Sequence, residues 1–143
     1  MSRPAGRTAP CSRADAGTRF RRAEAFLFIA DLLLGEQTSE TDDAINLSGV
    51  AAALAVLAGI AASDAACCHR LGRRPRGQDH RQALALVRTI APGGPAMESD
   101  LERLLNLKDN ARYGVLGVSN KDARSAVEQA TRLVEAARVI LVG

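Results

Sequence analysis

The residues whose types could do chemistry are concentrated between positions 62 and 84, in the stretch ASDAACCHRLGRRPRGQDHRQAL. This stretch holds Asp64, two adjacent cysteines, both histidines of the chain and five arginines. A histidine can accept a proton, and an arginine can stabilise the negative charge of a phosphate. The stretch is therefore either a site that handles phosphate esters or the charged, solvated end of a helix and its turn.

Four of these residues are potential metal ligands: Cys67, Cys68, His69 and His80. Zinc needs ligands that converge on one point, whereas three consecutive residues of a helix diverge. We expect no metal and no other cofactor, and we expect the cysteines to be buried and inert. Adjacent cysteines on a helix cannot easily bridge each other, and no disulfide framework is apparent, so we expect a reducing, cytoplasmic location.

Asp64 ends an apolar run, where a carboxylate is costly to bury unless it is paired. Two interpretations stay open: a structural ion pair or cap with His80, Arg73, Arg74 or Arg76, and a polar functional pocket. The basic turn around Pro75 could also contact phosphates. No aromatic residue is interleaved to stack a base, which argues against sequence reading of a single strand.

Apolar spacing predicts the elements that position these residues. Helices are expected over about 18–34, 43–71, 79–90, 99–113 and 119–141, with no alternating strand. Stops and caps are expected at Gly35, Gly72, Asp79, Ser99 and Ser119. The fold class is therefore all-α, as an up-and-down bundle of four to five helices.

Composition supports one small-residue bundle, because 47% of the 143 residues are hydrophobic and only 3% are aromatic. The formal net charge of the chain is +3, but it is uneven. Residues 1–22 carry six arginines and one acidic residue, Asp15, which gives them a net charge of +5. The rest of the chain therefore has a net charge of −2. We expect residues 1–17 to be a basic, disordered arm and residues 18–143 to be the bundle. The apolar run 47–62 is too short and too rich in alanine for a typical span, which predicts a core helix and no membrane.

A second polar group follows the fourth expected helix, in LLNLKDNARYGVLGVSNKDA. It contains Lys108, Asp109, Arg112 and Tyr113 on about one and a half helical turns. The stretch from Asp100 to Leu141 resembles the C-terminal half of HEPN domains. RAEAFLFIADLLL and AGIAASDAACCHRLGRRPRGQDHRQAL look like an actinobacterial-type branch of that superfamily, so the resemblance covers roughly residues 19–142.

The resemblance implies a helical bundle of toxin–antitoxin or defence systems, a homodimer, and a nucleotidyltransferase or antitoxin as partner. Active members are metal-independent RNases that carry an arginine, four to six residues, and a histidine near the penultimate helix. This chain departs from that motif, because Lys108 stands where the arginine would fall and Arg112 or Tyr113 where the histidine would. A tyrosine has a pKa of about 10 and is a poor general base at neutral pH. The motif is therefore degenerate.

Three functions remain open. The favoured hypothesis is a HEPN-like component that binds RNA, a nucleotide or a partner protein without strong catalysis, through Asp64, Arg73, Arg76, Lys108, Asp109, Arg112 and Tyr113. The alternative is a metal-independent endoribonuclease toxin that uses Arg74 and His80, which have five residues between them in RPRGQDH. The third is a helical interaction module with no nucleic-acid role.

Overall fold

The computed structural model describes residues 8–36, 46–77, 79–113 and 118–143, and only the backbone of residues 110–113. Within these ranges the chain forms five helices and one two-stranded antiparallel ribbon. The helices are α1 (Arg13–Gly35), α3 (Leu47–Leu71), α4 (His80–Arg88), α5 (Gly94–Tyr113) and α6 (Asn120–Val142). The strands are β1 (Thr8–Pro10) and β2 (Arg73–Pro75). The predicted all-α class is confirmed.

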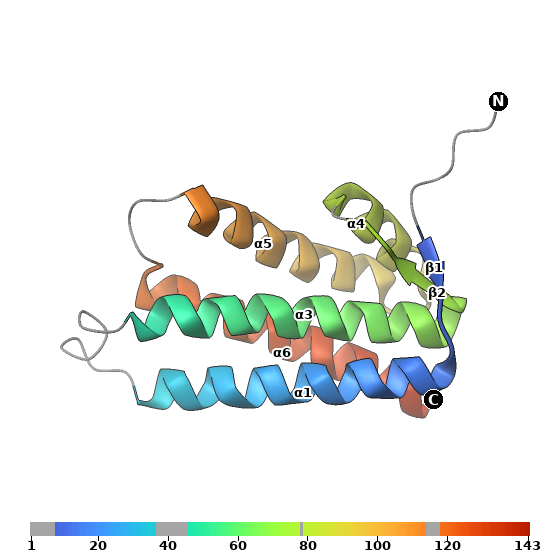
Figure 1. Cartoon of the computed structure of the whole chain (residues 1–143), viewed down its shortest axis with the longest axis horizontal. Helices are drawn as coiled ribbons and strands as arrows, with labels where there is room; N and C mark the ends of the chain where they lie inside the picture. The colour runs from blue at the N-terminus through green and yellow to red at the C-terminus, as the bar shows by residue number, and fades with distance from the viewer. Residues whose placement is uncertain (1–7, 37–45, 78, 114–117) are drawn as a thin grey trace.

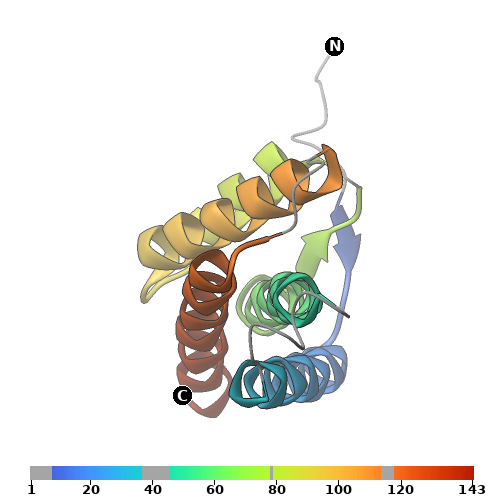
Figure 2. The ribbon, with the colours of Figure 1, turned by 90° about the vertical axis from the view of Figure 1, so that its left-hand side faces the viewer.

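The four long helices form an up-and-down bundle (Figure 1). Helices α1 and α5 run toward one end of the bundle, and α3 and α6 run toward the other. Viewed along its length, the bundle places α3 among α1, α5 and α6 (Figure 2), and α3 packs against all three. The short helix α4 and the ribbon lie together at the end where α3 finishes.

Small residues allow these helices to pack closely. Ala16, Ala23 and Ala30 repeat every seven residues and are fully buried on the face of α1 that packs chiefly against α3. In α3, a methyl group at Gly59 would collide with Leu104 of α5 and press on Leu133 of α6. The alanine-rich composition thus sets the spacing of the bundle around α3.

Helix α3 is long and apolar enough to cross a membrane by length and composition, and 67% of an 18-residue apolar stretch within it is buried inside the bundle. The same test is passed by the central helix of a soluble bundle. Fourteen residues of α3 are buried, including Ser48 and Ser63 along with its alanines and cysteines. This packing agrees with the predicted core helix.

The N-terminal part of the chain differs from the prediction. Helix α1 begins at Arg13 because Ser12 and Asp15 form a capping box, with Ser12 Oγ accepting from the Asp15 amide at 3.0 Å. Asp15 Oδ2 in turn accepts from the Ser12 amide at 2.9 Å. Residues 8–17, expected to be disordered, are therefore ordered, while residues 1–7 of the predicted arm lie outside the described ranges.

The start of α5 also differs from the prediction. The helix begins at Gly94, and Ser99 lies within it instead of capping it. A proline is tolerated in the first turn of a helix, where amides lack intrahelical partners, so Pro95 does not exclude this start. Gly93 has a φ of 90°, a value that disfavours side chains, and makes the bend before the helix.

Candidate functional site

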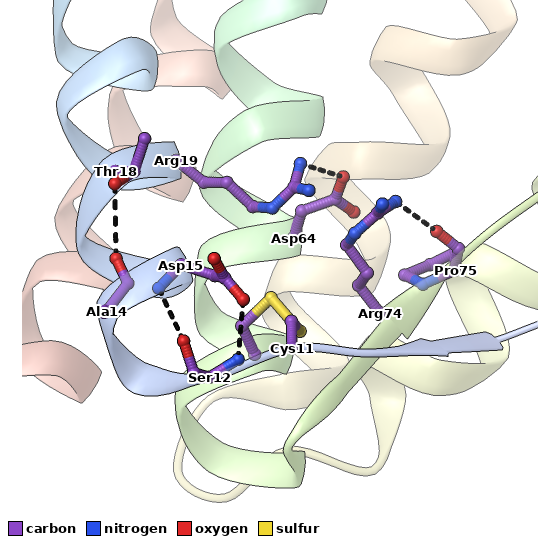
Figure 3. Close-up of a disulfide and its surroundings, with 10 residues drawn as sticks. Cys11, Ser12, Ala14, Asp15, Thr18, Arg19, Asp64, Arg74 and Pro75 are labelled. Atoms are coloured by element: carbon purple, nitrogen blue, oxygen red, sulfur yellow. Dashed lines mark hydrogen bonds and ion pairs between the residues drawn. A yellow bond between two sulfur atoms is a disulfide. The ribbon is translucent and has the colours of Figure 1, made fainter.

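A disulfide organises the end of the bundle where the candidate residues gather (Figure 3). It joins Cys11, just after β1, to Cys68 near the end of α3, and the Cys11 amide donates to the Gly72 carbonyl at 3.0 Å. The expectation that Cys67 and Cys68 are both inert is therefore wrong for Cys68, and so is the expectation that no disulfide forms. Cys67 is free and buried. The cytoplasmic location stays a prediction, although disulfides persist mainly in oxidising compartments.

Two predicted capping residues define the turn between α3 and α4. Gly72 ends α3 with a φ of 72°, a left-handed conformation that glycine adopts readily. Asp79 begins α4, and its Oδ1 accepts from the Arg81 amide at 3.0 Å. Between them, β2 pairs with β1 in a register that places Arg74 opposite Ala9. This turn brings His80 to the same cavity as Asp64 of α3.

The cavity has a volume of about 180 Å³ and lies between α3, α4, α5 and the turn that follows β2. Ile60, Ala83, Val87, Leu101 and Leu105 supply apolar walls, Pro75 comes from the end of β2, and Gly77 from the turn that follows it. Its polar lining is Ser63, Asp64, Asp79, His80 and Lys108. The structure thus brings together three predicted site residues that are far apart in sequence: Asp64, His80 and Lys108.

Asp109, also predicted, lies beside the cavity histidine. Its Oδ2 is 3.5 Å from His80 Nδ1, and the two side chains are 48% and 31% exposed. This separation is longer than a hydrogen bond, so the contact is an electrostatic one that strengthens when His80 is protonated. A carboxylate on the Nδ1 side favours the imidazole orientation that leaves Nε2 available.

Asp64 is the most perturbed carboxyl group of the site. Burial raises its pKa from the usual 3.8 to about 6, and the charges of Arg19 and Arg74 partly oppose that rise. Arg19 Nη1 lies 3.9 Å from Asp64 Oδ2. The ion pair expected for Asp64 therefore exists, but its partner on α1 was not foreseen, because no local pattern links residues so far apart.

Ser63, next to Asp64, is a second feature that sequence reasoning missed. The residue is 2% exposed, and its hydroxyl makes no hydrogen bond to any described group. It lines the cavity. A serine inside an alanine-rich run is the only signal in the sequence, and it does not distinguish a buried hydroxyl from a bonded one.

Arg74 lies beside Asp64 and not beside His80. Its Nη1 donates to the Pro75 carbonyl at 3.2 Å, and the guanidinium sits next to the Asp64 carboxylate (Figure 3). No contact joins Arg74 to His80 among the described side chains. Of the two residues in the endoribonuclease hypothesis, His80 therefore lines the cavity, whereas Arg74 lies beside Asp64 and is not among the lining residues.

Exposed arginines surround this end of the bundle. We call Arg13, Arg70, Arg73, Arg76 and Arg81 the basic end; all are exposed, and none forms an ion pair with a carboxylate in the described ranges. The pKa of His69 is lowered mainly by burial and further by the positive charges of Arg13 and Arg70. Arg73 and Arg76, both predicted site residues, belong to the basic end.

The remaining predicted residues add little to the description of the site. The side chains of Arg112 and Tyr113 lie outside the described part of the chain. Burial raises the pKa of the Cys67 thiol to about 12, so this cysteine stays protonated and unreactive. Across the described ranges, no three histidine, cysteine, aspartate or glutamate side chains group as metal ligands would.

The helical order and this site can now be compared with known proteins. The family model of the HEPN domain matches residues 16–140, which is most of the chain. The chain belongs to the HEPN family. Among curated proteins, none matches it. The matched range begins within α1 and ends within α6, so the HEPN domain contains all the helices that form the cavity. The actinobacterial branch and the degenerate motif stay predictions.

Proposed function

We propose that this HEPN domain binds RNA at its basic end, as a component of a prokaryotic toxin–antitoxin or defence module, without strong catalysis. HEPN domains often occur in toxin–antitoxin and RNase-type modules. The observation that carries the proposal is the basic end itself. Five exposed arginines without carboxylate partners in the described ranges lie at the same end of the bundle as a cavity lined by Lys108 and His80.

Unpaired arginines suit phosphates because a guanidinium offers several donors in a fixed plane and stays charged. An arginine already held by a carboxylate would have to break that pair before it bound a phosphate. The basic end needs no such exchange in the described ranges. Its strand β2 and the helix ends on either side also fix the spacing of the charges.

The experiment is a titration of the disulfide-bonded protein with single-stranded RNA at several salt concentrations. Replacing Arg73 and Arg76 by alanine should weaken binding and reduce the slope of log affinity against log salt by about 1 to 1.5. The matched control replaces Arg103 and Arg124, which are exposed on α5 and α6. Equal losses in both double variants, or no RNA binding by the wild type, would contradict the proposal.

The second candidate is the metal-independent endoribonuclease, and the contact between His80 and Asp109 favours it. In that reaction His80 Nε2 takes the proton of a ribose 2′-hydroxyl, and the oxygen attacks the adjacent phosphorus. The bond to the 5′-oxygen breaks, that oxygen takes a proton from an acid such as Lys108, and a 2′,3′-cyclic phosphate remains. Arg74 or Lys108 would stabilise the charge on the phosphate.

Incubation with total RNA in the presence of a chelator separates the two candidates. Cleavage by the wild type that His80→Ala abolishes would establish the endoribonuclease and overturn the non-catalytic proposal. Asp109→Asn should then slow cleavage less than His80→Ala does, because Asp109 acts on the imidazole and not on the RNA. RNA binding without cleavage supports the favoured proposal.

We further propose a homodimer, with a nucleotidyltransferase or an antitoxin as the partner protein. Phe28, Ile29 and Leu32 of α1 are 62%, 43% and 50% exposed, and their helical spacing makes one apolar surface. Such a surface supports association with a second copy. Light scattering tests it: the wild type should have twice the monomer mass, and Leu32→Glu should shift the mass toward the monomer.

A further inference from the structure

The cavity beside the basic end contains a buried hydroxyl with no partner. Ser63 is 2% exposed, lines the cavity, and makes no hydrogen bond within the described structure. Buried polar groups in folded proteins nearly always have a partner from protein, water or ligand. Asp64, also in the lining, meets Arg19 only at 3.9 Å, and no hydrogen bond to its carboxylate is made in the described structure. Two adjacent polar groups are therefore available to a ligand.

The size of the cavity limits what that ligand can be. Its volume of about 180 Å³ exceeds the space of a single water, which is about 30 Å³ in the liquid. It is smaller than the pockets that enclose drug-sized molecules, which start at about 300 Å³. One ring system fits this range, while the rest of the ligand must stay outside.

The walls and the rim suit different parts of one molecule. Ile60, Ala83, Val87, Leu101 and Leu105 present apolar surface, which matches the faces of an aromatic ring. Lys108 in the lining and the arginines of the basic end provide positive charge outside. A flat ring that hydrogen-bonds at its edge and is linked to a phosphate has this distribution of chemistry. A nucleotide of a single-stranded RNA is such a molecule.

The Asp64 carboxylate selects among the four bases. Guanine presents two adjacent N–H donors, N1–H and the 2-amino group, and they match the two oxygens of a carboxylate. Adenine and cytosine each place an acceptor nitrogen beside the amino group, and uracil places its single N–H between two carbonyls. Enzymes that take up an extruded base read this same edge.

We propose that the cavity is a guanine pocket: one guanine of a bound RNA enters it, its Watson–Crick edge faces Asp64, and Ser63 bonds a remaining polar atom of the base. This inference rests on the proposed RNA binding at the basic end and adds base preference to it. Burial raises the pKa of Asp64 to about 6, and the charges of Arg19 and Arg74 limit that rise, so the carboxylate is mostly ionised at pH 7.5, as the bidentate contact requires. The arginines hold the phosphates on either side.

The test compares short uridine-only RNA with the same RNA carrying one central guanosine, adenosine, cytidine or inosine. Guanosine should raise the affinity about tenfold or more, since a good bidentate pair discriminates to that extent. Inosine lacks the 2-amino group, so it should fall between guanosine and uridine. Asp64→Asn should reduce the guanosine preference to near one.

A second variant fills the cavity. Ala83→Phe places a ring among the apolar walls, whereas Ala85→Phe, on the exposed side of the same helix, is the matched control. The first should abolish the guanosine preference and the second should retain it, with folding checked by circular dichroism. If the wild type binds RNA with equal affinity for all bases, or if inosine equals guanosine, the guanine pocket is wrong and RNA binding stands. If the wild type binds no RNA, both are wrong.

Discussion

Two sets of arginines in this protein differ in their partners. Along the sides of the bundle, Arg88 pairs with Glu98 at 2.9 Å, and Arg132 pairs with Asp100 at 2.8 Å. Arg138 pairs with Glu24 at 2.9 Å and lies 5.2 Å from the ring centre of Phe20. The arginines of the basic end have no carboxylate partner in the described ranges. The same residue type thus joins helices at Arg88, Arg132 and Arg138. It has no carboxylate partner at the basic end, nor at Arg103 and Arg124 of α5 and α6, within the described ranges.

The difference shows how each region is held together. The sides are joined by ion pairs between helices, in addition to their apolar packing. The basic end has a covalent link instead, the bond between Cys11 and Cys68. Charges of one sign repel each other, and the disulfide holds this part of the chain together against that repulsion, next to the ion pair of Arg19 with Asp64. The following predictions test this contrast, from the largest expected effect to the smallest.

Removing the disulfide should have the largest effect on stability. Its two cysteines are 57 residues apart, and closing a loop of this length stabilises a protein by about 4 kcal/mol in the chain-entropy model. Cys11→Ser should lower the free energy of unfolding by up to this amount in denaturant titrations. Adding a reductant to the wild type should give a similar loss. Cys67→Ala, which removes the free thiol, is the control and should respond to reductant as the wild type does.

An unchanged unfolding midpoint in Cys11→Ser would show that the basic end is held by its noncovalent contacts alone. Such a result would remove the contrast with the sides of the bundle. It would also mean that the hydrogen bond between the Cys11 amide and the Gly72 carbonyl and the pairing of β1 with β2 suffice to hold the ribbon.

The cysteines also show what the sequence could not predict. Helix positions follow from apolar spacing within a few turns, so the helices were predicted, although the starts of α1 and α5 were not. The caps at Gly72 and Asp79 are local and were predicted correctly. The disulfide joins Cys11, which precedes α1, to Cys68 near the end of α3, and no local pattern specifies a pairing over that distance in sequence. The Ser12 capping box was visible in the sequence, but it lies in a segment whose basic composition indicated disorder.

Several residues of the candidate site could be predicted from the sequence. Asp64, His80, Lys108 and Asp109 were predicted because charged residues beside apolar helical runs are noticeable in the sequence. Their convergence on one cavity depends on how α4 and α5 pack against α3, which the sequence pattern does not determine. The unpaired state of Ser63 and the approach of Arg19 depend on the same packing.

The second prediction concerns Asp64, the buried carboxylate beside the basic end. A pKa of about 6 in the folded protein against 3.8 for the free side chain corresponds to about 3 kcal/mol of unfavourable free energy when the group is ionised. Asp64→Asn should therefore stabilise the protein by up to about 3 kcal/mol at pH 7.5. Thermal unfolding of both proteins across pH 3 to 8 measures this effect.

The sign of the pH dependence follows from the raised pKa. Because Asp64 binds its proton more tightly in the folded protein, its favourable contribution is complete below about pH 4 and is lost as pH rises through about 6. Arg19, Arg74, Asp79, His80 and Lys108 face the same region, and Cys67 stays protonated throughout. The Asn variant should lose the slope between pH 4 and 6. A variant less stable than the wild type at pH 7.5 would show that the ion pair with Arg19 outweighs desolvation.

The third prediction breaks a pair on the side of the bundle. Asp100 is 8% exposed, and Arg132 donates to it from Nη2 at 2.8 Å and from Nε at 3.2 Å. Arg132→Ala leaves that carboxylate buried without its partner, which should cost about 2 kcal/mol of stability. Arg124→Ala, which removes an exposed arginine bonded only to the Asn120 side chain, is the control. RNA affinity should change little in both, since neither residue belongs to the basic end.

The smallest effect on stability is expected at the basic end itself. Arg73 and Arg76 are exposed and have no carboxylate partner in the described ranges, so alanine at both positions should change the free energy of unfolding by less than about 0.5 kcal/mol. Relief of repulsion with Arg70 and Arg74 can make the change slightly favourable at low salt, and added salt should remove that gain. Denaturant titrations at low and high salt measure both effects. A loss comparable with that of Arg132→Ala would mean that these arginines hold the fold together, and the division between structural and available arginines would then fail.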